Sequence, residues 1–298
     1  MSLLNDFTAH LSKEHLLDPK GKFILAVSGG LDSLVLCDLC AQAGFDFSIA
    51  HCNFQLRGEE SDADEQFVVE TGSSYGKEVR VNRFDTERYA DSHKLSIQAA
   101  ARELRYQWFK QLVLEERSGH YLLTAHHADD NLETIVMNFF RGTGLAGLRG
   151  ILPVQGHLIR PLLPFHRELL EAYARERKLK WREDSSNITD TYTRNFFRHQ
   201  VLPLIQTRYP EASQNILGNA HRMGEVEQVY REAIGRYRKE LMKKQGEEGH
   251  LSVGKLKGLK PIDTHLFDLF HPFGFTAGQL PVIKELLDAD TGRSVRSS

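Results

Sequence analysis

A short segment that combines hydroxyl, glycine and carboxylate residues is the first place in this sequence where chemistry is expected. Its residues are Ser28, Gly29, Gly30, Leu31, Asp32 and Ser33. An apolar run over residues 23–27, typical of a strand buried on both faces, precedes it, and an apolar stretch of helical character follows until about Gly44. Glycines let the backbone turn sharply and approach a ligand, and the first N–H groups of a helix have no partner inside it. The segment is therefore predicted to seat a phosphate or a pyrophosphate.

This segment differs from the two commonest phosphate-binding motifs. No Gly-Lys-Ser or Gly-Lys-Thr follows, as a Walker A motif requires, and the glycine spacing is not that of a dinucleotide fold. Taken alone, the residues are also compatible with an ordinary structural turn between a strand and a helix.

A second polar stretch, residues 126–134, lies where a predicted strand over 120–125 gives way to a predicted helix over 129–141. Asp130 and Glu133 are three residues apart and share a helix face, and His126 lies just before that helix. An imidazole and two carboxylates could serve Mg²⁺, an ammonium group or general-base catalysis. The alternative is a polar helix N-terminus, where aspartate is expected in any case.

The elements that must position these residues alternate between strand and helix. Strands are predicted over residues 23–27, 45–53, 78–81 and 120–125, and helices over 1–20, 34–44, 59–70, 97–114, 129–141 and 167–178. This order predicts an α/β fold with a doubly wound parallel sheet, in which ligands bind beyond the carboxyl ends of the strands. Ser28, His51 and His126 each follow a strand, so one site could gather all three.

The character of the chain changes after about Pro210. A long charged helix is predicted over residues 215–244, followed by a small helical unit. The apolar residues expected to form the core of that unit are Phe267, Leu269, Phe270, Phe273 and Phe275. We therefore expect a first domain over residues 1–212 and a smaller helical C-terminal domain over 213–298.

Composition excludes several classes of protein. No apolar run is long enough to span a membrane, and no secretory signal is visible. Three cysteines are too few for a disulfide framework, which favours a reducing cytoplasm. Cys37 and Cys40 form a C-x-x-C pair, but they lie in an apolar helix, where they are predicted to pack as small hydrophobic residues. The net charge of −2 means that any contact with RNA must come from a local basic surface.

Several motifs in order resemble the tRNA(Ile)-lysidine synthase family of the PP-loop (adenine nucleotide alpha hydrolase-like) ATP-pyrophosphatase superfamily, over roughly residues 20–210. They are residues 28–33, His51 and Asn53 with Leu56 and Arg57, and residues 126–134, 141–145, 160–162, 183–187 and 194–195. The resemblance implies that the enzyme uses ATP to adenylate C2 of the first anticodon cytidine of a CAU-bearing tRNA(Ile). The amino group of free L-lysine then displaces AMP, which changes the specificity of the tRNA from methionine to isoleucine.

The resemblance also implies roles for individual residues. The segment Ser28, Gly29, Gly30, Leu31, Asp32 and Ser33 would hold the ATP phosphates, with Asp32 placed for Mg²⁺. His126, Asp130 and Glu133 would be catalytic or would bind lysine. Arg105 is favoured over Arg102 as an arginine of the site. Candidates for contact with the tRNA, or for the rim of the site, are Arg160, Arg194 and Arg198. One departure is Phe54, which stands where the family often has a second histidine, so this chain has no imidazole at that position.

Two other functions remain as alternatives. A tRNA thiolation enzyme has the same ATP loop but commonly uses a cysteine pair elsewhere in the fold, and no such second pair is visible here. A non-catalytic tRNA-binding relative would not require the intact loop together with Asp130 and Glu133. The helical part over 213–298 is expected to contact the tRNA, and the further C-terminal domain that is common in the family is not seen. The sequence leaves open whether the protein forms a homodimer.

Overall fold

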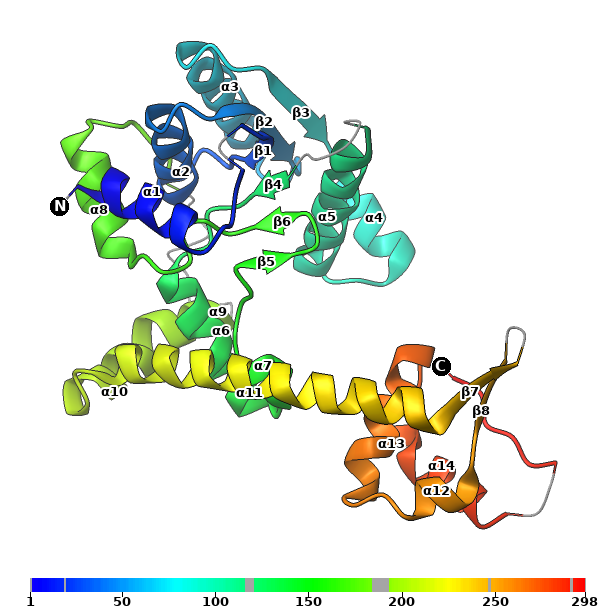
Figure 1. Cartoon of the computed structure of the whole chain (residues 1–298). Coiled ribbons are helices and arrows are strands. Elements are labelled where there is room, and N and C mark those ends of the chain that lie inside the picture. The colour runs from blue at the N-terminus through cyan, green and yellow to red at the C-terminus, as the bar shows by residue number, and fades with distance from the viewer. Residues whose placement is uncertain are drawn as a thin grey trace. The chain divides into compact units, whose positions relative to one another are not determined.

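The computed structural model describes residues 2–18, 20–115, 121–183, 193–245, 248–289 and 292–297. The chain forms two compact units, Met1–Ala220 and His221–Ser298. The boundary between them falls inside one long helix, α11 (Ala212–Leu241), which is yellow in Figure 1. No helix of the described residues is both long enough and apolar enough to cross a membrane.

The first unit is built on a six-stranded sheet with the order β3-β2-β1-β4-β6-β5. The strands are β1 (Lys22–Ala26), β2 (Asp46–Asn53), β3 (Val79–Arg83), β4 (Tyr121–Leu123), β5 (Val154–Gln155) and β6 (Leu158–Ile159). All neighbouring pairs are parallel except β5 and β6, which form an antiparallel pair at one edge. The predicted α/β fold with a mostly parallel sheet is thus confirmed. The short antiparallel pair of β5 and β6 extends this sheet at one edge.

Helices cover both faces of the sheet. Those of the first unit are α1 (Leu3–Lys13), α2 (Leu31–Gln42), α3 (Glu59–Ser74), α4 (Thr86–His93), α5 (Ile97–Glu115), α6 (Ala128–Arg141), α7 (Leu145–Leu148), α8 (Arg167–Glu176), α9 (Thr193–Phe196), η2 (Phe197–Val201) and α10 (Leu202–Arg208). Figure 1 shows α2 and α8 on one side of the sheet and α5 on the other. Successive side chains of a strand point to opposite faces, and accordingly Phe23 and Leu25 pack toward α2 while Ile24 packs toward α5.

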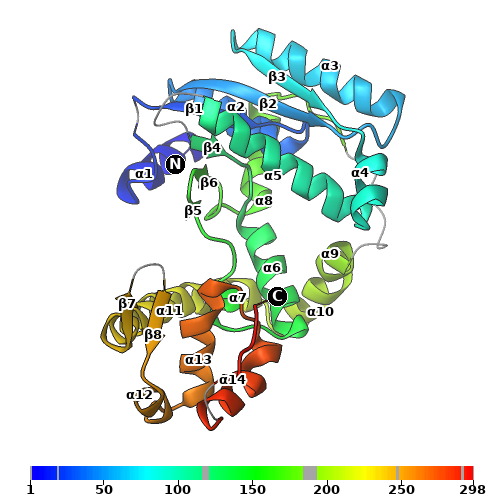
Figure 2. The same cartoon turned by 90° about the vertical axis from the view of Figure 1, so that its right-hand side faces the viewer.

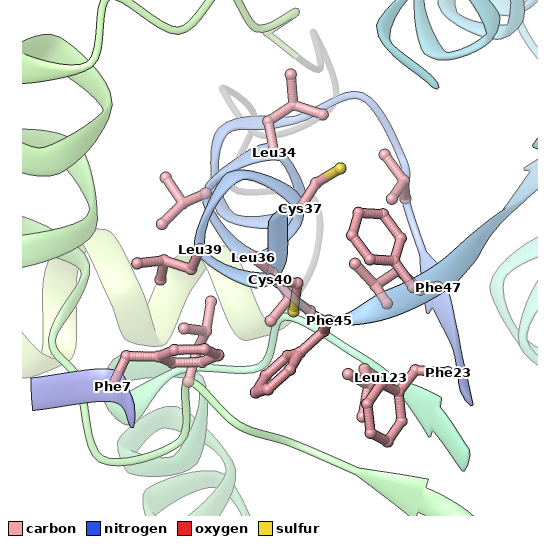
Figure 3. Close-up of a cluster of buried hydrophobic side chains, with 14 of the residues drawn as sticks. Phe7, Phe23, Leu34, Leu36, Cys37, Leu39, Cys40, Phe45, Phe47 and Leu123 are labelled. Carbon is pink, nitrogen blue, oxygen red and sulfur yellow. The ribbon is translucent and has the colours of Figure 1, made fainter. Parts of the chain in front are cut away.

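The cluster between the sheet and α2 is the largest apolar core of the first unit. Figure 3 shows Phe7 of α1, Phe23 of β1, Phe47 of β2 and several side chains of α2 within it. Helix α2 is buried nearly all round, which explains why its sequence has no polar face. It starts at Leu31, three residues before the predicted start, so Asp32 lies in the first helical turn. That turn faces the loop in which a phosphate is expected.

The second unit contains a β-hairpin and several short helices. Its elements after α11 are β7 (Met242–Gln245), β8 (Glu248–Leu251), α12 (Val253–Lys257), α13 (Ile262–Phe270), η3 (His271–Phe273), η4 (Ala277–Gln279) and α14 (Leu280–Leu287). Its buried core is Leu256, Leu266, Leu269 and Ile283, with Phe270 and Phe275 packed against it. The prediction that Phe273 belongs to this core is wrong, because its side chain is exposed. The hairpin was not predicted.

Candidate functional site

The loop between β1 and α2 has the backbone of an anion-binding turn. Gly29 has a φ of +92°, which L-residues with a side chain rarely adopt. Ser33 Oγ donates to the Gly30 carbonyl oxygen over 2.8 Å, and the Gly30 N–H donates to Ser28 Oγ over 3.3 Å. Gly30 is the N-cap residue of α2, and no side chain caps this helix end. The first N–H groups of α2 therefore remain available to a phosphate at the positive end of the helix dipole.

A segment far along the chain is held against this loop. The Arg182 N–H donates to the Gly29 carbonyl oxygen over 3.0 Å, and the Arg182 guanidinium forms an ion pair with Asp64 of α3. Arg57 binds the same carboxylate, with Nη2 2.7 Å from Asp64 Oδ2. Beside the loop lies an open hollow of about 470 Å³, lined by Phe67, Leu179, Lys180, Trp181 and Arg182. Asp64 thus anchors one side of an open hollow that adjoins the predicted phosphate seat.

A buried histidine joins α2 to the start of α6. His127 Nε2 lies 3.7 Å from Asp32 Oδ2 and 3.5 Å from Asp130 Oδ2, and Nδ1 lies 3.4 Å from Asp129 Oδ2. Burial opposes a charge on this imidazole, but the three carboxylates outweigh it and raise the pKa of His127. Arg167 of α8 adds Nη1 at 3.2 Å from Asp32 Oδ2 and donates its backbone N–H to Asp129 over 2.8 Å. In this cluster, His127 and Arg167 therefore lie between the carboxylates of Asp32, Asp129 and Asp130.

Sequence reasoning missed three members of this cluster: His127, Asp129 and Arg167. A signal for the first two was present, because each directly adjoins a predicted site residue. Helix geometry directs neighbouring residues to different sides, so the pair could not be placed without the packing of α6 against α2 and α8. Arg167 carried no signal beyond its charge.

Asp32 has a buried oxygen suited to a cation. Its Oδ1 is inaccessible to solvent and has no hydrogen-bond partner among the described residues. Burial raises the pKa of Asp32, while His127 and Arg167 oppose that rise. No group of three or more metal-ligating side chains occurs within the described part of the chain. This donor set fits Mg²⁺ held by one carboxylate and by substrate phosphates better than a site built from protein ligands alone.

His126 is kept neutral by its surroundings. Its Nδ1 lies 2.9 Å from Thr124 Oγ1 at the end of β4. Burial, partly opposed by Asp130, lowers the pKa of His126 to about 4. Arg102 is among the cations that contribute to this shift, whereas Arg105 lies over the Phe54 ring, with its guanidinium carbon 5.2 Å from the ring centroid. Arg102 is thus one of the cations near His126, and the expected role of Arg105 in the site stays a prediction.

The predicted carboxylates of α6 are paired with predicted arginines. Arg198 Nε lies 2.5 Å from Glu133 Oε1, and its Nη2 lies 3.4 Å from Asp130 Oδ1. Arg194 Nε lies 3.3 Å from Glu133 Oε2, and its Nη2 donates to Thr134. The Glu133 side chain is only 1% exposed, so the pair excludes water from this carboxylate. The structure thus brings Asp130 and Glu133 together, as expected, with two arginines closing over them.

Arg160, a predicted contact for tRNA, does not belong to the surface. The residue is 5% exposed, and its Nη1 donates to the Leu152 carbonyl oxygen over 2.6 Å. A contact with tRNA requires an exposed side chain, but at the end of β6 the Arg160 side chain turns inward and binds the Leu152 carbonyl oxygen and Gln155 Oε1. We therefore leave Arg160 out of the RNA contacts considered below.

His51 contributes to the scaffold of the site. Its Nδ1 lies 2.8 Å from the Val27 carbonyl oxygen, one residue before the phosphate loop begins, and the ring is buried. Asn53 donates to Glu65 of α3 over 2.8 Å. Asp32, in the first turn after the phosphate loop, contacts His127, which directly follows His126. That one site gathers Ser28, His51 and His126 stays a prediction.

Two of the three cysteines form part of the apolar core. Cys37 and Cys40 are 0% exposed and pack in the cluster shown in Figure 3. Burial raises the pKa of the Cys37 thiol to about 12. A thiol that stays protonated is a poor nucleophile and a poor metal ligand, so the predicted core role is confirmed.

Comparisons with known proteins identify the fold and the family of this chain. Residues 3–205 match a family model described as a PP-loop domain, and residues 244–298 match one described as a TilS substrate binding domain. A U34-tRNA thiolase from Methanococcus maripaludis has a similar fold, with a TM-score of 0.61 and 17% identity, over 74% of this chain and 80% of that one.

Two relatives named tRNA(Ile)-lysidine synthase are more similar in sequence. The protein from Bacteroides thetaiotaomicron is 37% identical over 95% of this chain and 66% of its own length. The protein from Chlorobaculum tepidum is 38% identical over 97% of this chain and 90% of its own. The chain spans slightly less than two thirds of the length of the first of these relatives. By these matches, the chain belongs to the tRNA(Ile)-lysidine synthase family of PP-loop proteins.

Proposed function

We propose that this protein uses ATP and Mg²⁺ to join L-lysine to C2 of the first anticodon cytidine of a CAU-bearing tRNA(Ile), with an adenylated tRNA as the intermediate. The observation that carries the proposal is the uncapped start of α2 together with the unpartnered Asp32 Oδ1 in its first turn. A phosphate and a cation are the complementary groups for these two features. Membership of the lysidine synthase family supports the choice of substrates.

In the first step, the cytidine O2 attacks the α-phosphorus of ATP, and pyrophosphate leaves. Residues 28–33 hold the phosphates through backbone N–H groups and the Ser28 and Ser33 hydroxyls. Mg²⁺ on Asp32 would neutralise charge on the phosphates and the leaving pyrophosphate. His126, neutral at physiological pH, can donate or accept a hydrogen bond at the α-phosphate. The hollow lined by Phe67 and Trp181 is suited to the adenine ring, because aromatic faces stack on bases.

In the second step, the ε-amine of lysine attacks C2 and AMP leaves. Free lysine arrives as an ammonium with a pKa of about 10.4, so it must be bound and then deprotonated. Glu133 already binds a cation of the same charge in Arg194. An incoming ammonium can therefore replace that guanidinium without leaving a buried carboxylate unpaired. A carboxylate removed from water and relieved of a guanidinium partner is a better proton acceptor, which favours Glu133 for the deprotonation step.

The remaining parts of the proposal concern the tRNA. Arg194 and Arg198 lie at the rim of the carboxylate pair and are proposed to meet the RNA there. The helical part of the chain over residues 213–298 is proposed to contact the tRNA body, with support from the substrate-binding family match. We place the reaction in the cytoplasm, where tRNA and ATP are available.

The test is mass spectrometry of the anticodon nucleoside after incubation of the protein with CAU-bearing tRNA(Ile), ATP and lysine. We expect cytidine to gain the mass of lysine minus one water, and AMP and pyrophosphate to appear in equal amounts. Omission of lysine should leave an adenylated nucleotide. A tRNA that binds but stays unmodified would contradict the proposal, as would a mass gain that requires a sulfur donor.

A further inference from the structure

Three exposed phenylalanines lie together at the end of α6 and in α9. Phe139, Phe140 and Phe196, here called the aromatic patch, are 66%, 67% and 43% exposed. The Phe139 and Phe140 rings are 5.7 Å apart, and both Phe140 and Phe196 contact the buried Phe197, with centroids 5.7 and 5.9 Å away. Figure 2 shows α6 and α9 close to each other. The patch is thus a continuous aromatic surface fixed to the protein by Phe197.

The segments that carry this patch are basic and contain no acidic residue. Residues 134–166 and 193–210 include no Asp or Glu, although the whole chain has a net charge of −2. Apart from the buried Arg160, their arginines are Arg141, Arg149, Arg194, Arg198 and Arg208. Exposed aromatic rings set among arginines complement a polyanion that carries planar groups. Single-stranded nucleic acid has this chemistry, because its bases stack on aromatic side chains while its phosphates meet cations.

The position of the patch relates it to the candidate site. Helix α6 carries Asp130 and Glu133 in its first half and the two phenylalanines near its end. At 1.5 Å per residue, the patch lies roughly 9–15 Å along the helix from these carboxylates. A few nucleotides of an extended strand cover that distance. Arg194 and Arg198, which contact Glu133, flank Phe196 and Phe197 in the sequence, so the two regions are continuous.

We propose that the aromatic patch is a stacking platform for unpaired bases of the RNA loop whose cytidine enters the carboxylate site. The inference rests on the proposed function and adds the surface that holds the neighbouring nucleotides. A base that has left the loop stack loses its stacking energy, and the rings of Phe139, Phe140 and Phe196 restore part of it.

A second copy of the chain is a poorer occupant of this surface. A two-fold dimer through the patch would place the same surface of each protomer face to face. Arg141, which follows Phe140 directly, would then approach its own counterpart, and residues 134–166 and 193–210 contain no Asp or Glu that could separate the two charges. Repulsion between like charges disfavours that contact, whereas phosphates are attracted to the same arginines.

The test uses a hairpin RNA with a CAU anticodon loop that carries 2-aminopurine beside the cytidine. We expect wild-type protein to quench the fluorescence of this base by stacking. The variants Phe139→Ala, Phe140→Ala and Phe196→Ala should each weaken binding about 5- to 150-fold and relieve the quenching. Phe140→Leu keeps an apolar side chain without a π-face and should behave like Phe140→Ala. Leu114→Ala, at an exposed apolar residue of α5, is the matched control and should change neither measurement.

The outcomes separate this inference from the proposed function. If the Phe variants show wild-type affinity, wild-type quenching and normal lysidine formation, the platform is overturned and the proposed function stays intact. Wild-type protein that binds the hairpin without quenching would likewise overturn the platform, whereas absence of lysidine formation on the full CAU-bearing tRNA(Ile) would instead contradict the proposed function. Sedimentation of the wild type and variants decides the remaining case. A dimer that dissociates in Phe140→Ala, with unchanged RNA affinity per protomer, would overturn the platform in favour of a self-association surface.

Discussion

Arg198 binds the Glu133 carboxylate through two hydrogen bonds, with Nε 2.5 Å from Oε1 and Nη2 3.1 Å from Oε2. The two residues are 65 positions apart in the sequence, and their side chains meet because η2 packs against α6. A carboxylate expected to handle the lysine nucleophile is thus held by a cation of this chain. In the proposed second step, the ammonium of lysine takes the place of the Arg194 guanidinium on Glu133. A substitution of Glu133 therefore tests the lysine-binding step directly.

For Glu133→Gln, we expect adenylated tRNA to form and accumulate, because the amide can neither bind the ammonium strongly nor accept its proton. Lysine transfer should slow by about 10²- to 10⁴-fold, the usual contribution of a general base. The substitution also leaves Arg198 without its main partner. Because that guanidinium is partly exposed, the loss of unfolding free energy should stay near 1–3 kcal/mol. Quenched-flow measurement of adenylate and lysidine separates the two steps.

A matched control for this variant is Glu70→Gln, which changes an exposed glutamate that accepts a hydrogen bond from Gln66. It should transfer lysine at the wild-type rate. If Glu133→Gln fails to form the adenylate, the carboxylate serves the first step instead, for example through Mg²⁺. Wild-type lysine transfer in Glu133→Gln would remove the residue from the mechanism.

Asp32→Asn should abolish AMP formation while the protein stays folded. The substitution removes the charge that would hold Mg²⁺, and it also weakens the contacts of Asp32 Oδ2 with Arg167 and His127. The free energy of unfolding should therefore fall by about 1–3 kcal/mol, which leaves the protein folded. Addition of Mg²⁺ with ATP should raise the melting temperature of wild type and not of the variant, because only binding to the native state stabilises it. Normal AMP release from the variant would exclude Asp32 from the ATP site.

Asp64→Asn should weaken ATP binding more than it slows chemistry. Asp64 anchors Arg182, whose backbone holds the phosphate loop at Gly29, so its loss loosens one wall of the hollow. We expect KM for ATP to rise about 10-fold, with kcat reduced by less than about threefold, as for the loss of one charge-assisted hydrogen bond. Glu60→Gln is the matched control, because it removes an ion pair with Arg57 and leaves the Asp64–Arg182 pair in place. Equal changes of KM and kcat in both variants would show that ATP binding depends on the net charge of α3 and not on the Asp64–Arg182 pair.

His126 should make stability depend on pH in the acidic range. A histidine in the unfolded chain has a pKa of about 6.5, and burial lowers the pKa of His126 to about 4 in the folded protein. Between these values the unfolded state binds a proton that the folded state excludes. Stability is therefore greatest above pH 6.5 and falls as the pH is lowered toward 4, by at most about 1.4 kcal/mol per pH unit for this group.

Urea unfolding at pH 7 and pH 5 measures this dependence. His126→Asn should lose less stability than wild type between the two values, whereas the exposed-residue control His221→Asn should match wild type. His51, whose pKa burial also lowers, leaves part of the dependence in both proteins. An unchanged pH dependence in His126→Asn would mean that His126 titrates as it does in water.

Local sequence was sufficient to determine the phosphate loop and the class of fold. The apolar run of β1, the two glycines and the apolar helix α2 are adjacent in the chain, so their geometry follows from backbone preferences and burial. The alternation of strands and helices leads to a mostly parallel sheet, because parallel neighbours require crossover connections. For the same reason, the carboxyl ends of the strands could be expected to carry the site.

Tertiary packing alone decided which charged groups meet. Asp32 reaches His127, and Glu133 reaches Arg194 and Arg198, across separations that no periodicity spans. Arg160 has the same charge as Arg194, yet the end of β6 turns it into the interior. Side-chain charge is a property of the sequence, but the pairing and burial of that charge depend on how α2, α6, α8 and η2 pack together. The electrostatic character of the site therefore appears only in the folded chain.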